Sequence, residues 1–246
     1  NKNELLELGG EAYQYNYGER NEMYAAIVGQ PSIQFFGYKT DGVWVSDAQI
    51  QEARDNGLTT QITNFFVPGG LRYADTNGDN VIDTDDRVVL GDPFPDFMWG
   101  FSNAFKFKNF DLNVLLQGSQ GGKLINGDAN YNEQKRFNKR YNSEDRWLSA
   151  MYPGDGKTPY FTSGADWNVS DYILEDASYM SLRSVILGYT LPKTALKKTG
   201  LGSVRLYAVA DNLLYLKGKG YRGINPEARV TSGAYASPLI TGYQRG

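Results

Sequence analysis

Apolar and polar residues alternate along several stretches of the chain, and the alternation is clearest over residues 97–107, FMWGFSNAFKF. Its odd positions carry aromatic side chains at Phe97, Trp99, Phe101, Phe105 and Phe107. The even positions are mostly small or polar, as at Gly100, Ser102, Ala104 and Lys106. A period of two predicts a β-strand that has one apolar face.

The same pattern restarts after Lys108 and Asn109, over residues 110–118, FDLNVLLQG. One face carries the apolar residues Phe110, Leu112, Val114 and Leu116, and the other carries Asp111, Asn113 and Gln117. A break of two residues between two alternating runs predicts a tight β-hairpin turn.

A second pair of strands is predicted at residues 179–191 and 203–216, joined by PKTALKKTGLG. In the later strand one face carries Val204, Leu206, Ala208 and Ala210, and the other carries Arg205, Tyr207 and Asp211. Residues 32–44 form a further strand candidate with poorer alternation.

The connections between these strands are of unequal length. About fifty residues separate Trp44 from Phe97, and about fifty more separate Gly118 from Asp171. Each contains a helix candidate, at residues 46–57 with Ser46 as N-cap and Gly57 as the stop, and at residues 143–151. Long connections at one end and short ones at the other are typical of outer-membrane barrels with long extracellular loops and short periplasmic turns.

The 18 tyrosines and 12 phenylalanines support the barrel interpretation. Aromatic rings at strand ends suit the girdles that lie at the level of the lipid headgroups; the candidates are Phe36, Tyr38, Phe97, Tyr172, Tyr189 and Tyr215. A soluble β-sandwich whose aromatics fill the core is the alternative. Connections of about fifty residues favour the barrel, because compact sandwiches rarely carry loops of that length.

Composition excludes several classes of function. The net charge is −3, and the basic residues do not gather in one stretch of sequence, so no nucleic-acid partner is expected. The chain has no Cys and no His, which removes disulfides, thiolate zinc sites, cysteine nucleophiles and the usual general base. No run approaches the roughly 20 apolar residues of a membrane helix, and residues 1–10 lack the features of a signal peptide.

No enzyme activity is expected. Glu175 and Asp176 are the best candidates for a pair of catalytic carboxylates. Adjacent residues on a strand point to opposite faces, so these two side chains do not converge on one glycosidic bond.

Residues 75–86, DTNGDNVIDTDD, have the oxygen spacing of a calcium loop. Side-chain oxygens fall at loop positions one, three, five, nine and twelve, which are Asp75, Asn77, Asp79, Asp83 and Asp86. Val81 at position seven would contribute its backbone carbonyl. Asn80 replaces the usual glycine at position six, and Asp86 replaces the usual glutamate at position twelve. We expect a structural Ca²⁺ ion, with Mg²⁺ less well matched to the ligand count. The alternative is a loop of Asx-turns without an ion.

Several segments together resemble the C-terminal barrel region of TonB-dependent outer-membrane transporters of the SusC/RagA type. In the order of the family, they are residues 28–44, 69–122, 172–192 and 204–216, followed by NPEA at 225–228. The family's Asp-Pro-Glu is Asn225-Pro226-Glu227 here.

This resemblance implies an all-β fold: an antiparallel transmembrane β-barrel segment, part of a plugged barrel of roughly 22 strands. Residues 1–246 would be the C-terminal portion of the receptor barrel, a fragment without the plug domain and last strand. We expect a fragment because open barrel edges would leave unpaired backbone groups in lipid.

The resemblance also implies a function and a location. The receptor would lie in the outer membrane of a Gram-negative bacterium and import oligosaccharides or oligopeptides, with a SusD-like surface lipoprotein and the TonB system, which acts through the plug, as partners. No cargo-binding residue is predicted. The loop aromatics Trp147, Tyr152, Tyr160 and Trp167 are interpreted as packing residues in preference to sugar-stacking ones. The alternative function is a soluble, calcium-stabilised carbohydrate-binding β-sandwich module.

Overall fold

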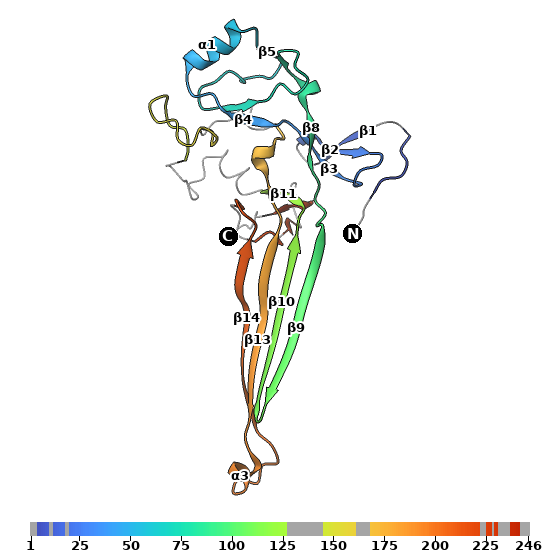
Figure 1. Ribbon diagram of the computed structural model, residues 1–246, viewed down its shortest axis with the longest axis vertical. Helices are drawn as coiled ribbons and strands as arrows, with labels where there is room; N and C mark the ends of the chain where they lie inside the picture. The colour runs from blue at the N-terminus through green and yellow to red at the C-terminus, as the bar shows by residue number, and fades with distance from the viewer. Residues whose placement is uncertain are drawn as a thin grey trace. The chain divides into compact units, whose positions relative to one another are not determined.

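The computed structural model describes residues 4–9, 12–17, 20–126, 145–160, 168–221, 225–227, 229–230 and 237–241 (Figure 1). The contacts within the chain divide it into two compact units. We call residues 95–122 and 176–221 the strand unit, and residues 2–94, 123–175 and 222–246 the loop unit. No helix in the described ranges is long and apolar enough to cross a membrane.

The strand unit is one antiparallel sheet with the strand order β14-β13-β10-β9. Its strands are β9 (Phe97–Phe107), β10 (Phe110–Gln120), β13 (Tyr179–Thr190) and β14 (Arg205–Lys217). All four strands predicted from the alternation are confirmed within two residues at each end. The predicted tight turn is also present, with Lys108 in the left-handed region at φ 51°.

The register places the apolar positions of the four strands on one face. In one row across the sheet, Phe107 pairs with Phe110, Phe110 with Tyr189, and Tyr189 with Leu206. A β-bulge on β13 shifts the register between Leu182 and Ser184, so the alternation resumes one residue later.

The two short connections lie at the same end of this sheet (Figure 1). One is the turn between β9 and β10, and the other contains the short helix α3 (Lys193–Leu196) between β13 and β14. The long connection from β10 to β13 leaves from the opposite end, as the sequence predicts.

The loop unit consists of short strands in several small sheets. The first has the order β1-β2-β3-β8 and the second β12-β11-β16-β15, and two pairs are β4-β6 and β5-β7. The pairs β5/β7 and β11/β16 are parallel, and the other pairings with a recorded register are antiparallel. The strand bounds are Ala12–Tyr17, Arg20–Ile27, Gln34–Gly37, Thr40–Val43, Thr59–Thr60, Leu71–Tyr73, Val81–Ile82 and Val88–Gly91 for β1 to β8, Lys123–Asn126 for β11, Leu174–Asp176 for β12, Arg229–Val230 for β15 and Ser237–Thr241 for β16.

Two apolar clusters hold the loop unit together. The larger contains Tyr38, Val43, Trp44, Ile50, Phe65, Leu71, Tyr73 and Ile82. The other contains Tyr24, Phe35, Leu90, Ile125, Val169 and Ile173. Short 3₁₀-helices span Thr84–Asp86 and Asp171–Ile173. The first long connection is thus a folded module with its own buried core.

Helix α1 (Asp47–Asp55) confirms the first helix prediction. Ser46 is its N-cap and accepts a hydrogen bond from the backbone N–H of Gln49 at 3.3 Å. Ile50 is its buried residue and joins the larger core.

Two other predictions about local structure are wrong. Residues 32–44 form two short strands, β3 and β4, in different sheets of the loop unit. In the described part of the second helix candidate, residues 145–151, the backbone makes isolated bridges instead of a helix. The N–H of Trp147 donates to the carbonyl of Thr158 at 3.0 Å, so its hydrogen bond goes to a distant partner.

Candidate functional site

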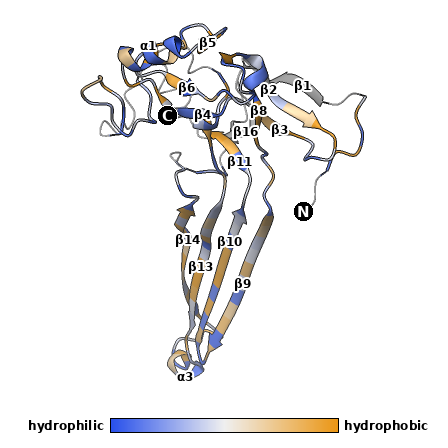
Figure 2. Cartoon of the chain, turned by 45° about the horizontal axis from the view of Figure 1, so that its top comes forward, coloured by the Kyte–Doolittle hydropathy of each residue, from blue (hydrophilic) through white to orange (hydrophobic). Residues whose placement is uncertain are grey.

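The apolar face of the strand unit is exposed over much of its length. Its side chains include Phe101 at 49% exposed, Phe105 at 56%, Phe107 at 69%, Leu187 at 48% and Leu206 at 61%. A soluble protein rarely leaves a contiguous apolar surface of this kind in water. Strands β9 and β10 each have 11 residues, which matches the 9–11 residues of a tilted transmembrane strand. Figure 2 shows hydrophobic and hydrophilic residues succeeding each other along these strands.

The opposite face of the same sheet is mixed: it carries hydrogen-bonded polar side chains together with Leu115, Ile186 and Val209. Gln117 on β10 and Asn212 on β14 flank Arg183 at the bulge of β13. The Arg183 guanidinium donates to the Asn212 side-chain oxygen at 3.2 Å. In the amide orientation that satisfies both groups, the Gln117 oxygen accepts from Nε and Nη2 of Arg183 at 2.7 Å each. Such a hydrogen-bonded face suits the water-filled or plugged interior of a barrel.

An ion pair crosses this polar face near the short turns. Arg205 donates from Nε to Asp111 Oδ1 at 3.1 Å and from Nη2 to Oδ2 at 2.5 Å. Asp111 is on β10 and Arg205 on β14, so the pair spans the intervening strand at Gly188. A Cβ at Gly188 would collide with both charged groups, so only glycine leaves room for this contact.

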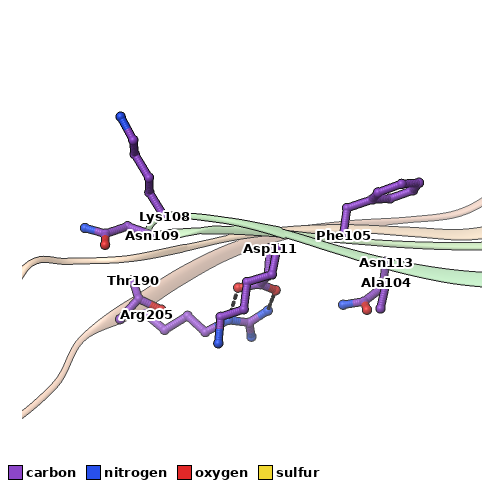
Figure 3. Close-up of a pocket in the computed structure, with 9 residues that line it drawn as sticks. Ala104, Phe105, Lys108, Asn109, Asp111, Asn113, Thr190 and Arg205 are labelled. Atoms are coloured by element: carbon purple, nitrogen blue, oxygen red, sulfur yellow. Dashed lines mark hydrogen bonds and ion pairs between the residues drawn. The ribbon is translucent and has the colours of Figure 1, made fainter.

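The ion pair borders an open depression of about 480 Å³. The other polar residues of its lining are Lys106, Lys108, Asn109, Asn113 and Thr190. Figure 3 shows Phe105 and Lys108 on the other side of the sheet from Asp111 and Arg205. The described lining has carboxylate, amide, hydroxyl and cationic groups, and it has the chemistry of a polar wall.

The aromatic residues predicted for the girdle lie in different environments. Phe97 is 54% exposed at the start of β9, and Tyr189 packs on Phe110 with ring centroids 4.6 Å apart near the short turns. Tyr38 is instead buried in the larger core of the loop unit. Tyr215 stacks on Tyr179 at 5.4 Å, and its register places it on the polar face. Sequence position near a strand end did not distinguish these environments.

Residues 75–86 form a tight loop in which acidic side chains accept backbone hydrogen bonds. Asp75 accepts from the N–H of Gly78 at 2.6 Å and from that of Asn80 at 2.8 Å. Asn80 has a positive φ of 62°, as expected of the residue that replaces glycine there. These bonds wind the chain around Asp75.

The remaining predicted ligands follow the same pattern. Asp79 accepts from the N–H of Val81 at 2.7 Å, and Asn77 from that of Asp79 at 3.0 Å. Asp86 is fully buried and accepts from Thr76 N–H at 2.6 Å and from Asp83 N–H at 3.0 Å. Within the described residues, no group of three or more acidic side chains is arranged to hold a metal ion. The side chains therefore face the backbone in this structure, and the calcium site stays a prediction.

Trp147 is a packing residue of the loop unit. Its indole Nε1 donates to the carbonyl of Val45 at 2.9 Å, and its ring meets that of Tyr160 edge-on at 5.7 Å. Gly69, with φ 79°, lies against the Trp147 ring and the Cβ of Tyr160, where an added Cβ would collide. Tyr152 is 67% exposed, and Trp167 lies outside the described residues.

The two candidate catalytic carboxylates have separate roles. Glu175 is buried, and Asp176 accepts a hydrogen bond from the N–H of Ser178 at 2.8 Å. Asp176 thus caps the start of β13 (Tyr179–Thr190). The structure gives no support to a paired acid and base at these positions.

Sequence reasoning missed the Asp111–Arg205 pair and the Arg183 contacts, because both join strands that are distant in sequence. One signal was present: Gly188 interrupts an otherwise large-residue strand, and such a glycine often marks a close approach.

The chain is similar in sequence to several TonB-dependent receptors. It is 34% identical over 195 residues to TonB-dependent receptor P3 of Formosa agariphila, a match that covers 79% of this chain and 18% of that protein. It is 30% identical over 253 residues to receptor P26 of the same organism, which covers 100% of this chain and 24% of that protein. TonB-dependent receptor SusC of Bacteroides thetaiotaomicron is 27% identical over 97% of this chain and 22% of its own length.

No family model matches the chain. A solved structure of the RagAB peptide transporter has the same fold, with a TM-score of 0.58 and 20% identity over 89% of this chain and 22% of that one. The chain spans about a fifth to a quarter of the length of these relatives. It therefore corresponds to part of a TonB-dependent receptor of the SusC/RagA type, a class of protein that lies in the outer membrane of Gram-negative bacteria.

Proposed function

We propose that this chain forms part of the barrel wall of an outer-membrane nutrient importer driven by the TonB system. One observation carries the proposal: the strand unit has an exposed apolar face, and its hydrogen-bonded polar side chains lie on the opposite face. The first suits lipid and the second suits a polar lumen. The similarity to TonB-dependent receptors supports the same function and leaves the soluble carbohydrate-binding alternative without support.

A SusD-like surface lipoprotein is the proposed partner, and oligosaccharides or oligopeptides are the proposed cargo. The partner is supported by similarity to SusC and by a fold shared with the RagAB peptide transporter. The loop unit would contribute to the extracellular side of the importer, because barrels of this kind carry their long connections there. In this arrangement the TonB system would act through a plug in the rest of the receptor.

We also propose that residues 75–86 bind a structural Ca²⁺ ion that stabilises the loop. The oxygen spacing supports it, as does the winding of the backbone around Asp75, which presents the next carbonyls and carboxylates in sequence. The ion would have no catalytic role.

The import function is tested with the intact receptor in its native organism. We expect the receptor to fractionate with the outer membrane, and its deletion to abolish growth on one class of oligosaccharide or oligopeptide supplied as sole nutrient. A deletion strain that lacks TonB as well should grow no worse than the single deletion. Recovery of the receptor in the soluble fraction would contradict the proposal, and uptake that persists without TonB would contradict the energy source.

A further inference from the structure

The end of the strand unit that carries the two short turns is strongly basic. Residues 104–111 and 188–207 contain six basic side chains and one carboxylate, namely Lys106, Lys108, Lys193, Lys197, Lys198, Arg205 and Asp111. The rest of the strand unit has three basic and three acidic side chains. The entire positive excess of this unit therefore lies at one end, although the whole chain carries a net charge of −3.

Asp111 is the one carboxylate within residues 104–111 and 188–207, all of which the structure describes. It is bonded to Arg205 and lies directly opposite Lys106 in the register. The four other lysines, Lys108, Lys193, Lys197 and Lys198, are exposed, and we call them the basic collar. Lys108 is in the β9–β10 turn. Lys193 begins α3, and Lys197 and Lys198 follow that helix, at the same end of the sheet (Figure 1).

Apolar and aromatic side chains lie beside the basic collar. The ammonium group of Lys108 is 5.3 Å from the centre of the Phe107 ring, on the apolar face. Phe110 and Tyr189 lie in the same row as Phe107, with their rings tilted and their centroids 4.6 Å apart. Leu201 is 56% exposed in the turn that follows Lys198. At a membrane–water interface, aromatic rings commonly lie at the edge of the apolar surface and lysines extend beyond them into water. The basic collar and the neighbouring aromatic rings have this arrangement.

We propose that the basic collar binds the phosphate headgroups of anionic phospholipids at the membrane surface where the short turns emerge. This inference rests on the proposed barrel function, in which the short turns face the periplasm. Charge complementarity selects the ligand, because each lysine near an anionic surface raises the affinity by up to about fivefold. The attraction falls as salt shortens the Debye length to about 8 Å at physiological ionic strength and less above it.

The test uses the full-length receptor reconstituted into phosphatidylcholine vesicles with trace spin-labelled phosphatidylglycerol. The motionally restricted fraction of the label gives the association of this lipid relative to spin-labelled phosphatidylcholine. We expect the wild-type receptor to prefer phosphatidylglycerol. The triple variant Lys193→Gln, Lys197→Gln, Lys198→Gln should lower the preference by about two- to fivefold, and arginine at all three positions should preserve it.

A matched control removes three exposed lysines elsewhere, Lys39→Gln, Lys157→Gln and Lys219→Gln, and should keep the preference at the same net charge. An equal loss in this control, or an unchanged preference in the first variant, would overturn the inference. If the wild-type receptor restricts both spin-labelled lipids equally, with no preference for phosphatidylglycerol, the inference is overturned but the membrane function is not. The absence of all restricted lipid from the wild-type receptor would overturn the membrane function as well.

Discussion

Arg205 reaches over Gly188 to hold Asp111, so a side chain of β14 is tied to one of β10 across the strand between them. The contact exists only in one register of three strands. A slip of one residue in any of them would turn a charged group toward the apolar face. The pair therefore acts as a marker of correct strand pairing near the short turns.

The first prediction concerns this glycine. Gly188→Val should displace Arg205 from Asp111 and lower the temperature at which the receptor unfolds. Unfolding is measured by gel electrophoresis, as the loss of the faster-migrating band of the folded receptor. In the background of Asp111→Ala the same substitution should cost less, because the contact that it disrupts is already absent. Equal losses in both backgrounds would show that the glycine acts through strand packing alone.

The second prediction tests the two faces of β10. Leu112→Arg places a charge on the apolar face and should block assembly of the receptor, at a cost of up to about 2–4 kcal/mol near the bilayer midplane. Asn113→Arg, one residue further on the polar face, should assemble normally. The measurement is the amount of folded receptor in the outer-membrane fraction, and a normal level for Leu112→Arg would contradict the assignment of that face to lipid.

The third prediction concerns the proposed calcium loop. Asp75→Ala combined with Asp79→Ala should remove bound calcium from the purified full-length receptor, as measured by elemental analysis. Asp85→Ala removes an exposed carboxylate from the same loop at a position outside the ligand pattern, and the metal content should then be unchanged. A receptor that contains no calcium, or that keeps it in the double variant, would favour the loop of Asx-turns without an ion.

The fourth prediction separates packing from cargo binding at Trp147. Trp147→Phe should cost about 1 kcal/mol through the lost hydrogen bond to Val45, and Trp147→Ala up to about 3 kcal/mol through lost packing. Both should increase protease cleavage of the loops in the absence of cargo. Tyr152→Ala, which removes an exposed ring, should leave the cleavage unchanged. Weaker cargo uptake with unchanged protease resistance would identify Trp147 as a binding residue instead.

The fifth prediction concerns pH. Partial burial raises the pKa of Asp155, but hydrogen bonds from the backbone N–H groups of Thr158 and Lys157 outweigh it, so the pKa lies below its usual value. The stabilisation is therefore complete above the unfolded pKa of about 3.9 and is lost as the pH falls through the lower folded value.

Amide hydrogen exchange at Thr158 and Lys157 should accordingly be slow near neutral pH. In acid, protonation of Asp155 should weaken these hydrogen bonds, so that the two amides open more often and lose protection. Asp155→Ala should remove the protection at every pH, whereas Asp155→Asn, which keeps an acceptor oxygen, should retain part of it without the acid-dependent step. Acid sensitivity that survives in Asp155→Asn would assign the effect to another group.

Local sequence patterns were enough to predict the four long strands, their tight turn, the two faces of the sheet and helix α1. These features depend on neighbouring residues: a period of two fixes which side chains share a face, and Ser46 caps a helix three residues away. The family could be identified for the same reason, since its signatures are stretches of consecutive residues. Residues 145–151 show the limit of local reasoning, because partners more than six residues away, such as Thr158, replaced the helix.

Contacts between residues that are distant in sequence became visible only in the folded sheet. Pairing of β10, β13 and β14 brings Asp111 to Arg205, which are 94 positions apart, over a glycine that leaves the space. The same pairing collects Lys108 with Lys193, Lys197 and Lys198 at one end of the sheet, although the basic residues are dispersed along the sequence. Contacts of this kind depend on register and strand order, which are set by the packing of the whole sheet and which no local pattern encodes.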